Sequence, residues 1–336
     1  MRILSALALS AALVSPLFAV QAMVLAHRGA SGYLPEHSFP AKAMAHAQGA
    51  DFVEQDLVLT KDGVPIVLHD IHLDTITDVA KKFPERKRTD GRYYAIDFTL
   101  AEIKQLDATV RFHPETGSPV YPNRFPLNGH VYQLHTFEEE IRFIQGLNHS
   151  TGRSVGLYTE LKQPTFHRNE GQDLARIAVA ILIRYGYADK KDGCWIQCFE
   201  QTTIRRLRDE LGWKGNTMMI LGGAKKGADG TDYNYLATLQ GMKELVAPYA
   251  DAIGPNIDRV VIWDKTGKLH VSSFTRDAHA AGLRVHWGVT RRDDLPANCP
   301  SYDALLEALY TTAGTEGGFT DFPDLNVQWL KDHRKR

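Results

Sequence analysis

Two closely spaced carboxylates are the first residues of this chain that could do chemistry. Glu54 and Asp56 stand two residues apart in an apolar run, residues 53–60. Side chains two apart in a β-strand point to the same face. Carboxylates that face a protein interior are costly unless something neutralises them. An exposed strand would avoid that cost, but the apolar neighbours Val53 and Leu57 favour a buried strand and therefore a bound cation.

A histidine is predicted to lie beside this pair. Asp62 and Gly63 stand between two apolar runs. This arrangement predicts a hairpin with a two-residue type I′ turn. The register of that hairpin places Asp56 opposite His69 on the same face. We therefore expect an imidazole next to the carboxylates.

A second histidine and an arginine come at the end of the apolar run that begins at Met23. The order is His27, Arg28, Gly29. An arginine can bind two phosphate oxygens at once, and glycine lets the backbone turn sharply. If this strand neighbours the one that carries the carboxylates, His27 and His69 could flank one substrate. Two imidazoles so placed can act as general acid and general base.

A third carboxylate and a further cation lie in the run of residues 155–161 and directly after it. Glu160 and Lys162 would share one face of that strand. An internal ion pair is the alternative interpretation. Three carboxylates with no softer ligand indicate Ca²⁺ or Mg²⁺ rather than zinc. Together with Arg28 and the histidines, this set suits displacement at a phosphodiester.

Short apolar, β-branched runs alternate with helical patterns along the chain, as expected for a parallel sheet. The predicted strands are residues 23–27, 51–59, 155–161, 194–199, 216–221, 251–255, 283–289 and 317–321. Helices are predicted at 39–48, from Thr99, from Thr136, and at 174–185, 202–211, 235–249, 271–281 and 302–313. Eight such units predict a TIM (β/α)8 barrel, whose active site lies at the carboxyl ends of its strands.

One long interval, residues 71–135, contains no predicted barrel strand. A structureless loop of this length is unusual in a compact domain. We therefore predict a small subdomain inserted after the second strand and its hairpin. Its aromatic side chains are expected to form a small core of their own; they are Phe83, Tyr93, Tyr94, Phe98, Phe112, Tyr121 and Phe125.

The composition is that of a globular protein without a strong charge bias. Of 336 residues, 43% are hydrophobic and 24% charged, and the formal net charge is −1. The chain has no overall excess of basic residues, so its charge gives no indication of nucleic-acid binding.

The first 22 residues resemble a signal peptide. A short basic start precedes an apolar stretch and the small-residue pattern that ends at Ala22, with Ala19 as a second cleavage point. A membrane anchor is the alternative, because the stretch is almost long enough to span a bilayer. Pro16 and the lack of a basic flank favour export. The mature chain, 23–336, is expected to be one exported domain without a stable membrane anchor.

Several motifs together resemble the glycerophosphodiester phosphodiesterase family, in particular its secreted, periplasmic bacterial branch. They cover essentially the whole mature chain. The motifs are residues 27–37, 54–62, 69–70, 90–100, 136–141, 145–152, 160–162, 197–199 and 319–324.

The resemblance implies a TIM barrel and a role for each matching position. It implies catalytic roles for His27 and His69 and metal ligation by Glu54, Asp56 and Glu160, with Ca²⁺ as the usual ion and Mg²⁺ as the alternative. It places substrate or phosphate contacts at Arg28, Lys162, Glu36, Gln197, Phe199 and Trp287, with ligation by Glu36 left open. Two residues depart from the usual pattern, since Thr159 and Trp287 both replace proline.

The reaction implied is metal-dependent hydrolysis of glycerophosphodiesters such as glycerophosphocholine and glycerophosphoethanolamine. A glycerol hydroxyl would attack phosphorus, expel the alcohol and form a cyclic phosphate, which water opens to sn-glycerol 3-phosphate. Two alternatives stay open: a related phosphodiesterase that acts on lysophospholipids or sphingomyelin, and a non-enzymatic exported protein that binds phosphate esters. The expected partner is a small molecule, and a homodimer is an open alternative to a monomer.

Overall fold

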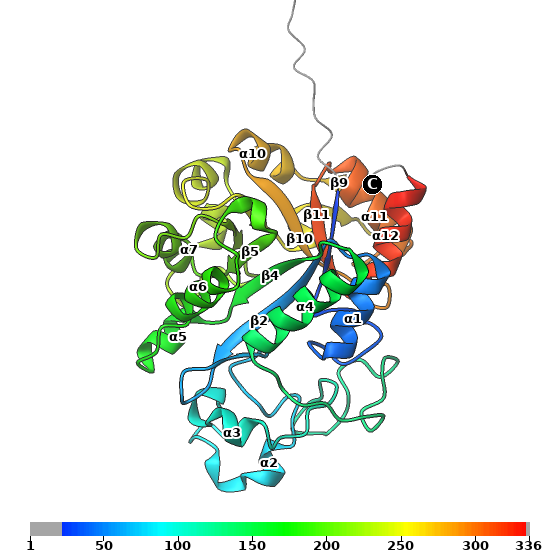
Figure 1. Cartoon of the computed structure of the whole chain (residues 1–336). Coiled ribbons are helices and arrows are strands. Elements are labelled where there is room, and N and C mark those ends of the chain that lie inside the picture. Colours follow the sequence, from blue (N-terminus) through cyan, green and yellow to red (C-terminus); the bar gives the residue numbers. More distant parts are fainter. Residues whose placement is uncertain (1–21, 334–336) are drawn as a thin grey trace, which may run out of the picture.

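The computed structural model describes residues 22–333, and all but the last residue of the predicted signal peptide lies outside this range. The main sheet has nine strands, of which β3 is antiparallel to its neighbour β2 and lies at the end of the strand order. The other eight run parallel, and pairing of β1 with β2 closes them into a barrel with helices around it (Figure 1). The barrel strands are β1 (Met23–Ala26), β2 (Phe52–Leu59), β4 (Gly156–Leu161), β5 (Cys194–Cys198), β6 (Asn216–Ile220), β7 (Ala252–Gly254), β10 (Arg284–Thr290) and β11 (Gly317–Thr320). The predicted TIM barrel and all eight of its predicted strands are confirmed.

The register of the sheet aligns the predicted polar positions. Asp56 on β2 pairs with Glu160 on β4, and Glu160 pairs with Gln197 on β5. Paired residues of neighbouring parallel strands lie at one level and share a face. Backbone pairing therefore brings these three side chains together before any side-chain contact is considered.

The hairpin after β2 differs from its prediction. Strand β3 (Pro65–Val67) pairs Leu57 with Val67, and the turn is a three-residue loop, residues 61–63. Gly63 has a φ of 75°, and the Asp62 carboxylate accepts hydrogen bonds from the Thr60 hydroxyl at 2.6 Å and the Leu100 N–H at 2.9 Å. A three-residue loop with a left-handed glycine is the next most common hairpin after the two-residue types.

The changed register moves the residue opposite Asp56. Leu68 donates its N–H to the Asp56 carbonyl at 3.0 Å, so the predicted pairing of Asp56 with His69 is wrong. His69 is the next residue along the chain, beyond the end of β3, and it reaches the same cavity as Glu54 from there.

Helices cover the outside of the barrel. They are α1 (Phe39–Gln48), α4 (Phe137–Thr151), α5 (Pro164–Asn169), α6 (Leu174–Arg184), α7 (Gln201–Asp209), α8 (Tyr233–Leu236), α9 (Leu239–Gly241), α10 (Phe274–Ala280), α11 (Tyr302–Leu306) and α12 (Pro323–Asp332). The Ser38 hydroxyl caps α1, and Thr136 with Glu139 forms the predicted capping box of α4.

Three predicted helices are altered. The one predicted at 235–249 is broken into short pieces that end in a π-helical turn, Met242–Val246. The one at 271–281 begins later, because β9 (Leu269–Val271) pairs with β8 (Val261–Trp263). The one at 302–313 continues from α11 as a π-helical turn, Glu307–Thr312.

The segment between β3 and α4 contains short helices and lies at one end of the barrel (Figure 1). Its elements are α2 (Val79–Lys82), α3 (Leu100–Ile103) and the 3-10 turns Pro84–Arg86 and Ala95–Asp97. Tyr93 and Phe98 are buried in a hydrophobic cluster that the segment shares with the β2–β3 hairpin. Tyr121 and Phe125 instead line a cavity, and Phe112 is not part of the cluster, so the prediction that all the aromatics form one small core is wrong for these three.

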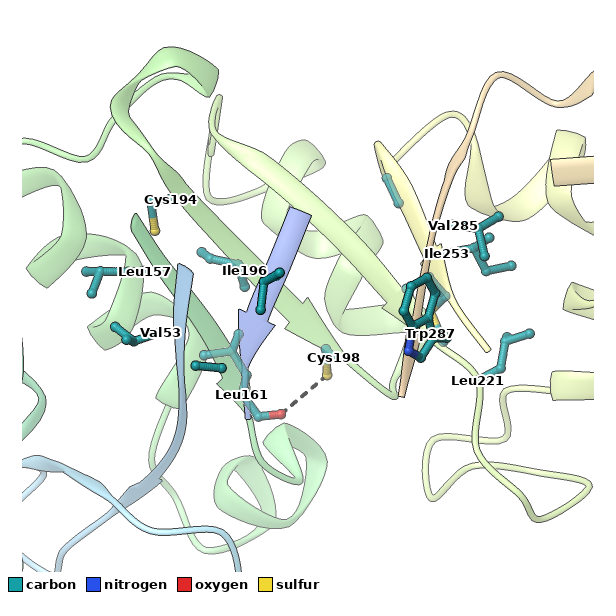
Figure 2. Close-up of a cluster of buried hydrophobic side chains, with 14 of the residues drawn as sticks. Val53, Leu157, Leu161, Cys194, Ile196, Cys198, Leu221, Ile253, Val285 and Trp287 are labelled. Atoms are coloured by element: carbon teal, nitrogen blue, oxygen red, sulfur yellow. Dashed lines mark hydrogen bonds between the residues drawn. The ribbon is translucent and has the colours of Figure 1, made fainter. Parts of the chain in front are cut away.

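The main hydrophobic core lies between the barrel strands and the outer helices (Figure 2). Cys198 is buried there, and its thiol donates to the Leu161 carbonyl at 3.5 Å. Inside the barrel, Tyr158 stacks on Trp195 with ring centroids 5.4 Å apart. Within residues 22–333, no helix is long and apolar enough to cross a membrane.

Candidate active site

The carboxyl ends of the barrel strands surround a cavity of about 380 Å³. Its lining includes the predicted residues His27, Arg28, Glu54, His69, Glu160, Lys162, Gln197 and Phe199. Active sites of TIM barrels lie at this end of the barrel. Residues far apart in the sequence therefore converge where the fold class predicts chemistry.

Buried acidic groups form one side of the site. Donor atoms of His37, Glu54 and Asp56 lie within 4.8 Å of one another. Asp56 Oδ2 lies 2.8 Å from His37 Nε2, whereas Asp56 Oδ1 has no hydrogen-bond partner among the described residues. His37 lies within the motif of residues 27–37 but was given no role there; it precedes helix α1 and has a positive φ of 62°.

The third predicted carboxylate, Glu160 on β4, pairs with Asp56 in the register of the sheet but is not among the donors that lie within 4.8 Å of one another. Lys162 Nζ lies 2.6 Å from Glu160 Oε1 and 3.6 Å from Asp56 Oδ1. Burial raises the pKa of Glu160 to about 7, although Lys162 opposes this. Burial and the neighbouring Asp56 carboxylate raise the pKa of Glu54 well above its usual value.

These observations fit a hard divalent cation. Among the described residues, Asp56 Oδ1 is buried without a hydrogen bond, and burial raises the pKa values of Glu54 and Glu160 although Lys162 and Arg28 lie nearby, so a bound cation would further stabilise the charged carboxylates. The donors are mainly oxygens, which Ca²⁺ and Mg²⁺ prefer. The cluster also offers one imidazole nitrogen, from His37.

Arg28 connects the carboxylates to the other side of the cavity. Its backbone N–H donates to Glu54 Oε2 at 2.7 Å, its Nε lies 3.5 Å from Asp56 Oδ2, and its Nη1 donates to Glu36 at 3.1 Å. The chain turns here as predicted, with positive φ values at Arg28 and Gly29. A Cβ at Gly29 would meet the Ala41 carbonyl carbon at 2.7 Å, so only glycine fits.

Each of the two predicted catalytic histidines is paired with a carboxylate. His27 Nδ1 lies 2.7 Å from Asp321 Oδ1, and His69 Nδ1 lies 2.6 Å from Asp70 Oδ1. A carboxylate at Nδ1 fixes the ring and leaves Nε2 as the nitrogen available to a substrate. Both rings line the same cavity.

Burial sets the charge of these rings. Burial and the nearby Arg28 lower the pKa of His27 to about 4, and burial, Arg28 and Lys162 lower that of His69 to about 3. Both imidazoles are therefore neutral near pH 7. A neutral imidazole can accept a proton from a hydroxyl, as a general base must.

Asp70 and Asp321, the carboxylates that hold these rings, were given no role in the sequence analysis. Both lie within motifs of the resemblance, residues 69–70 and 319–324. Asp70 directly follows His69, and Asp321 directly follows β11, the strand that pairs with β1. A carboxylate at the end of a strand next to the one that ends in histidine is a signal that could have identified Asp321.

Trp287 lines neither of the two cavities at this end of the barrel. The prediction that it contacts the substrate is therefore wrong. Its side chain is fully buried in the main core, with its ring 4.6 Å from that of Tyr310 (Figure 2). Alternation along β10 explains this, because successive side chains point to opposite faces. The neighbouring His286 faces the cavity instead. Its Nδ1 lies 2.9 Å from the Tyr158 hydroxyl, and its Nε2 has no partner within residues 22–333.

A second cavity of about 220 Å³ adjoins the first and shares His27, Arg28, His69 and Arg291 with it. Glu36 lines this second cavity rather than the first, and Arg28 and Arg111 both pair with it. Burial alone would raise the pKa of Glu36, but the two guanidinium groups hold it well below its usual value. The opposite wall comes from the segment between β3 and α4, with Val110, Arg111, Val120, Tyr121, Arg124 and Phe125.

Residues 27–325 match the glycerophosphoryl diester phosphodiesterase family. The chain is 41% identical over 326 residues to the glycerophosphodiester phosphodiesterase of Haemophilus influenzae, a match that covers 92% of this chain and 90% of that protein. It is 39% identical over 330 residues to the glycerophosphodiester phosphodiesterase of Treponema pallidum, with 93% and 92% covered.

Solved structures support the fold. The chain is similar to a phosphodiesterase of Oleispira antarctica, solved in complex with the product sn-glycerol-3-phosphate, with a TM-score of 0.60 and 21% identity over 92% of this chain and 96% of that one. The family match and the two relatives each cover most of the sequence. The chain therefore belongs to the glycerophosphoryl diester phosphodiesterase family and is an enzyme, a glycerophosphodiester phosphodiesterase.

Proposed function

We propose that this enzyme hydrolyses small glycerophosphodiesters to sn-glycerol 3-phosphate and an alcohol, with a divalent cation and the two histidines as acid and base. The observation that carries this proposal is the pair of neutral imidazoles, each held by a carboxylate, at the edge of a cavity that also contains a carboxylate cluster. The solved Oleispira protein, which holds sn-glycerol-3-phosphate as its product, supports this choice of product by analogy.

The cation would be held by Glu54, Asp56 and Glu160, with His37 as a further donor. Ca²⁺ is the ion we propose, with Mg²⁺ as the alternative, because the donors are mainly carboxylate oxygens. When bound, such an ion stabilises negative charge on phosphate oxygens and lowers the pKa of a hydroxyl group.

Phosphate is proposed to bind where the two cavities meet. Arg28 lines both cavities, and Lys162 lines the larger one. The glycerol arm would lie in the larger cavity, because its attacking hydroxyl must be near the carboxylate cluster. The alcohol arm would then lie in the smaller cavity.

The histidines would move the protons. One imidazole, neutral at Nε2, accepts the proton of the attacking glycerol hydroxyl. The other ring must carry a second proton, on Nε2, when the substrate is bound; it delivers that proton to the oxygen of the departing alcohol and becomes neutral. The resulting cyclic phosphate is opened by water, with the two roles exchanged. Which ring begins as base is left open by the symmetry of the two pairs.

The experiment is a product assay across headgroups. Glycerophosphocholine, glycerophosphoethanolamine, glycerophosphoinositol and lysophosphatidylcholine are supplied at equal concentration, and sn-glycerol 3-phosphate and cyclic phosphate are measured by phosphorus NMR. We expect sn-glycerol 3-phosphate from the three glycerophosphodiesters. Faster turnover of lysophosphatidylcholine would favour a lysophospholipase-type phosphodiesterase, and binding without turnover would favour a phosphate-ester-binding protein.

We also propose that the enzyme is exported to the periplasm after cleavage near Ala22 or Ala19, which leaves one mature domain. The support is the apolar N-terminal pattern of the sequence. Mass spectrometry of the protein from cell fractions tests this, and an intact Met1 on the cytoplasmic protein would contradict it.

A further inference from the structure

We propose that Arg111 and Arg124, both from the segment between β3 and α4, are positioning residues that hold the two catalytic histidines in place through Asp70 and Asp321. This inference rests on the proposed roles of the histidines. It gives the segment a part in catalysis as well as in forming a wall of the smaller cavity.

Arg124 acts on the His27 pair. Asp321 uses Oδ1 for His27 at 2.7 Å and Oδ2 for Arg124 Nη1 at 2.8 Å. The same guanidinium donates to both oxygens of Asp293, at 2.8 and 2.9 Å. Its side chain is only 8% exposed, and its carbon Cζ lies 3.7 Å from the centre of the Tyr121 ring. Arg124 is therefore fixed from three sides and cannot easily leave Asp321.

Arg111 acts on the His69 pair in the same way. Asp70 uses Oδ1 for His69 at 2.6 Å, and its Oδ2 accepts from Arg111 Nη1. Arg111 also donates to both oxygens of Glu36, at 2.7 and 3.1 Å. Glu36 in turn accepts from Arg28, so Arg111 is linked to a proposed phosphate contact as well.

The two arrangements share one design. In each, a carboxylate bridges an imidazole and a guanidinium with its two oxygens. A carboxylate that loses its arginine can rotate, and the ring it holds then loses its fixed orientation. Removing a side chain that orients a residue of the active site through a hydrogen bond typically lowers activity by about 10- to 100-fold.

The two pairs differ in how much support remains without the arginine. Asp321 Oδ2 also accepts from Arg291 Nε at 2.8 Å. Within residues 22–333, the one hydrogen bond that Asp70 Oδ2 accepts besides that of Arg111 comes from the Thr75 hydroxyl, at 2.9 Å. We therefore expect Arg111→Gln to lower kcat more than Arg124→Gln does.

The test is a double-mutant cycle on the full-length enzyme. Arg124→Gln and Asp321→Asn are made singly and together, as are Arg111→Gln and Asp70→Asn, and kcat and KM are measured for glycerophosphocholine. Each arginine variant is expected to lower kcat by about 10- to 100-fold. Each should have little further effect when its aspartate is already replaced, because the arginine acts through that aspartate.

Arg92→Gln is the matched control. Arg92 lies in the same segment and pairs with a buried aspartate, Asp74, at 2.7 Å, but it contacts neither histidine pair. It should leave kcat unchanged. The conservative variant Arg124→Lys should restore part of the activity, since an ammonium group can still donate to Asp321.

A second readout does not depend on turnover. The proton on His27 Nδ1 that is hydrogen-bonded to Asp321 should give a downfield proton NMR signal, identified by its loss in His27→Ala. We expect this signal to weaken or shift in Arg124→Gln and to persist in Arg92→Gln. An unchanged signal in Arg124→Gln would overturn the proposal. So would a loss of kcat on Arg124→Gln that is equally large with and without Asp321→Asn. If the wild-type enzyme does not cleave glycerophosphodiesters, the proposed function fails, while the NMR result still decides the positioning role.

Discussion

At the scale of single residues, the site depends on pairs of side chains rather than on isolated groups. His27 and His69 each use one ring nitrogen for a carboxylate and line the cavity. Burial and nearby cations keep both rings uncharged near pH 7. A neutral ring of fixed orientation is suited to accept a proton from an attacking oxygen, and the ring that serves the departing oxygen must first gain a proton on Nε2.

Replacing either ring tests its role directly. His27→Ala and His69→Ala are each expected to lower kcat by about 100-fold or more, because each removes an acid–base group. Steady-state kinetics with glycerophosphocholine provide the measurement. Wild-type turnover in either variant would remove that histidine from the proposed pair.

The position of Trp287 gives a second prediction. Because its ring packs in the core, Trp287→Phe should lower the free energy of unfolding by about 1–3 kcal/mol and leave KM unchanged. Phe199→Leu is the opposite case, since Phe199 lines the cavity and its ring centre is 5.6 Å from Lys162 Nζ. Phe199→Leu should raise KM and lower the free energy of unfolding less than Trp287→Phe does. Urea unfolding measures the effect on stability, and steady-state kinetics measure the effect on KM. A raised KM in Trp287→Phe alone would return Trp287 to the substrate site.

At the scale of elements, strand periodicity was the most informative part of the sequence. Glu54 with Asp56, and Glu160 with Lys162, could each be assigned to one face of their strand because alternation along a strand is fixed by backbone geometry. Turn geometry could not be predicted, since Asp62 bonds to Leu100 far along the chain and the hairpin takes a three-residue loop. His37 and Arg111 were missed for the same reason: their partners are set by packing, which local sequence does not encode.

Helices α1 and α4 are joined beneath the site by a buried ion pair. Lys42 Nζ lies 2.8 Å from Glu140 Oε1 and also donates to the Glu54 carbonyl. His135 Nε2 lies 2.7 Å from Glu140 Oε2. The strand that carries two proposed metal ligands is thus tied to both helices.

This pair predicts a pH dependence of stability. Burial alone would raise the pKa of Glu140, but Lys42 and His135 lower it to about 2. A carboxyl whose pKa is lower in the folded state stabilises the fold above its unfolded pKa, about 4.3, and that stability is lost as pH falls toward about 2. Glu140→Gln should therefore be less stable at pH 7, by about 3 kcal/mol, and the difference should shrink below about pH 4. Urea unfolding at several pH values measures this, and a difference independent of pH would contradict the assignment.

At the scale of the whole molecule, barrel closure brings the two ends of the chain into one site. His27 follows β1 and Asp321 follows β11, and these two strands pair because the sheet closes. The segment between β3 and α4 adds the arginines that bind both carboxylates. The first strand, the last strand and the segment at the barrel mouth therefore join the carboxylates of β2 and β4 around one cavity.

Metal removal and restoration show whether the carboxylate cluster works with a bound cation. The enzyme is stripped with EDTA and desalted, and release of sn-glycerol 3-phosphate from glycerophosphocholine is measured as Ca²⁺ or Mg²⁺ is added back. Glu54→Gln is assayed in parallel. We predict that activity is lost without metal and recovers when the cation is added. Glu54→Gln should need a higher cation concentration for half-recovery than the wild-type enzyme. Full activity of the metal-free wild-type enzyme would contradict the need for a bound cation.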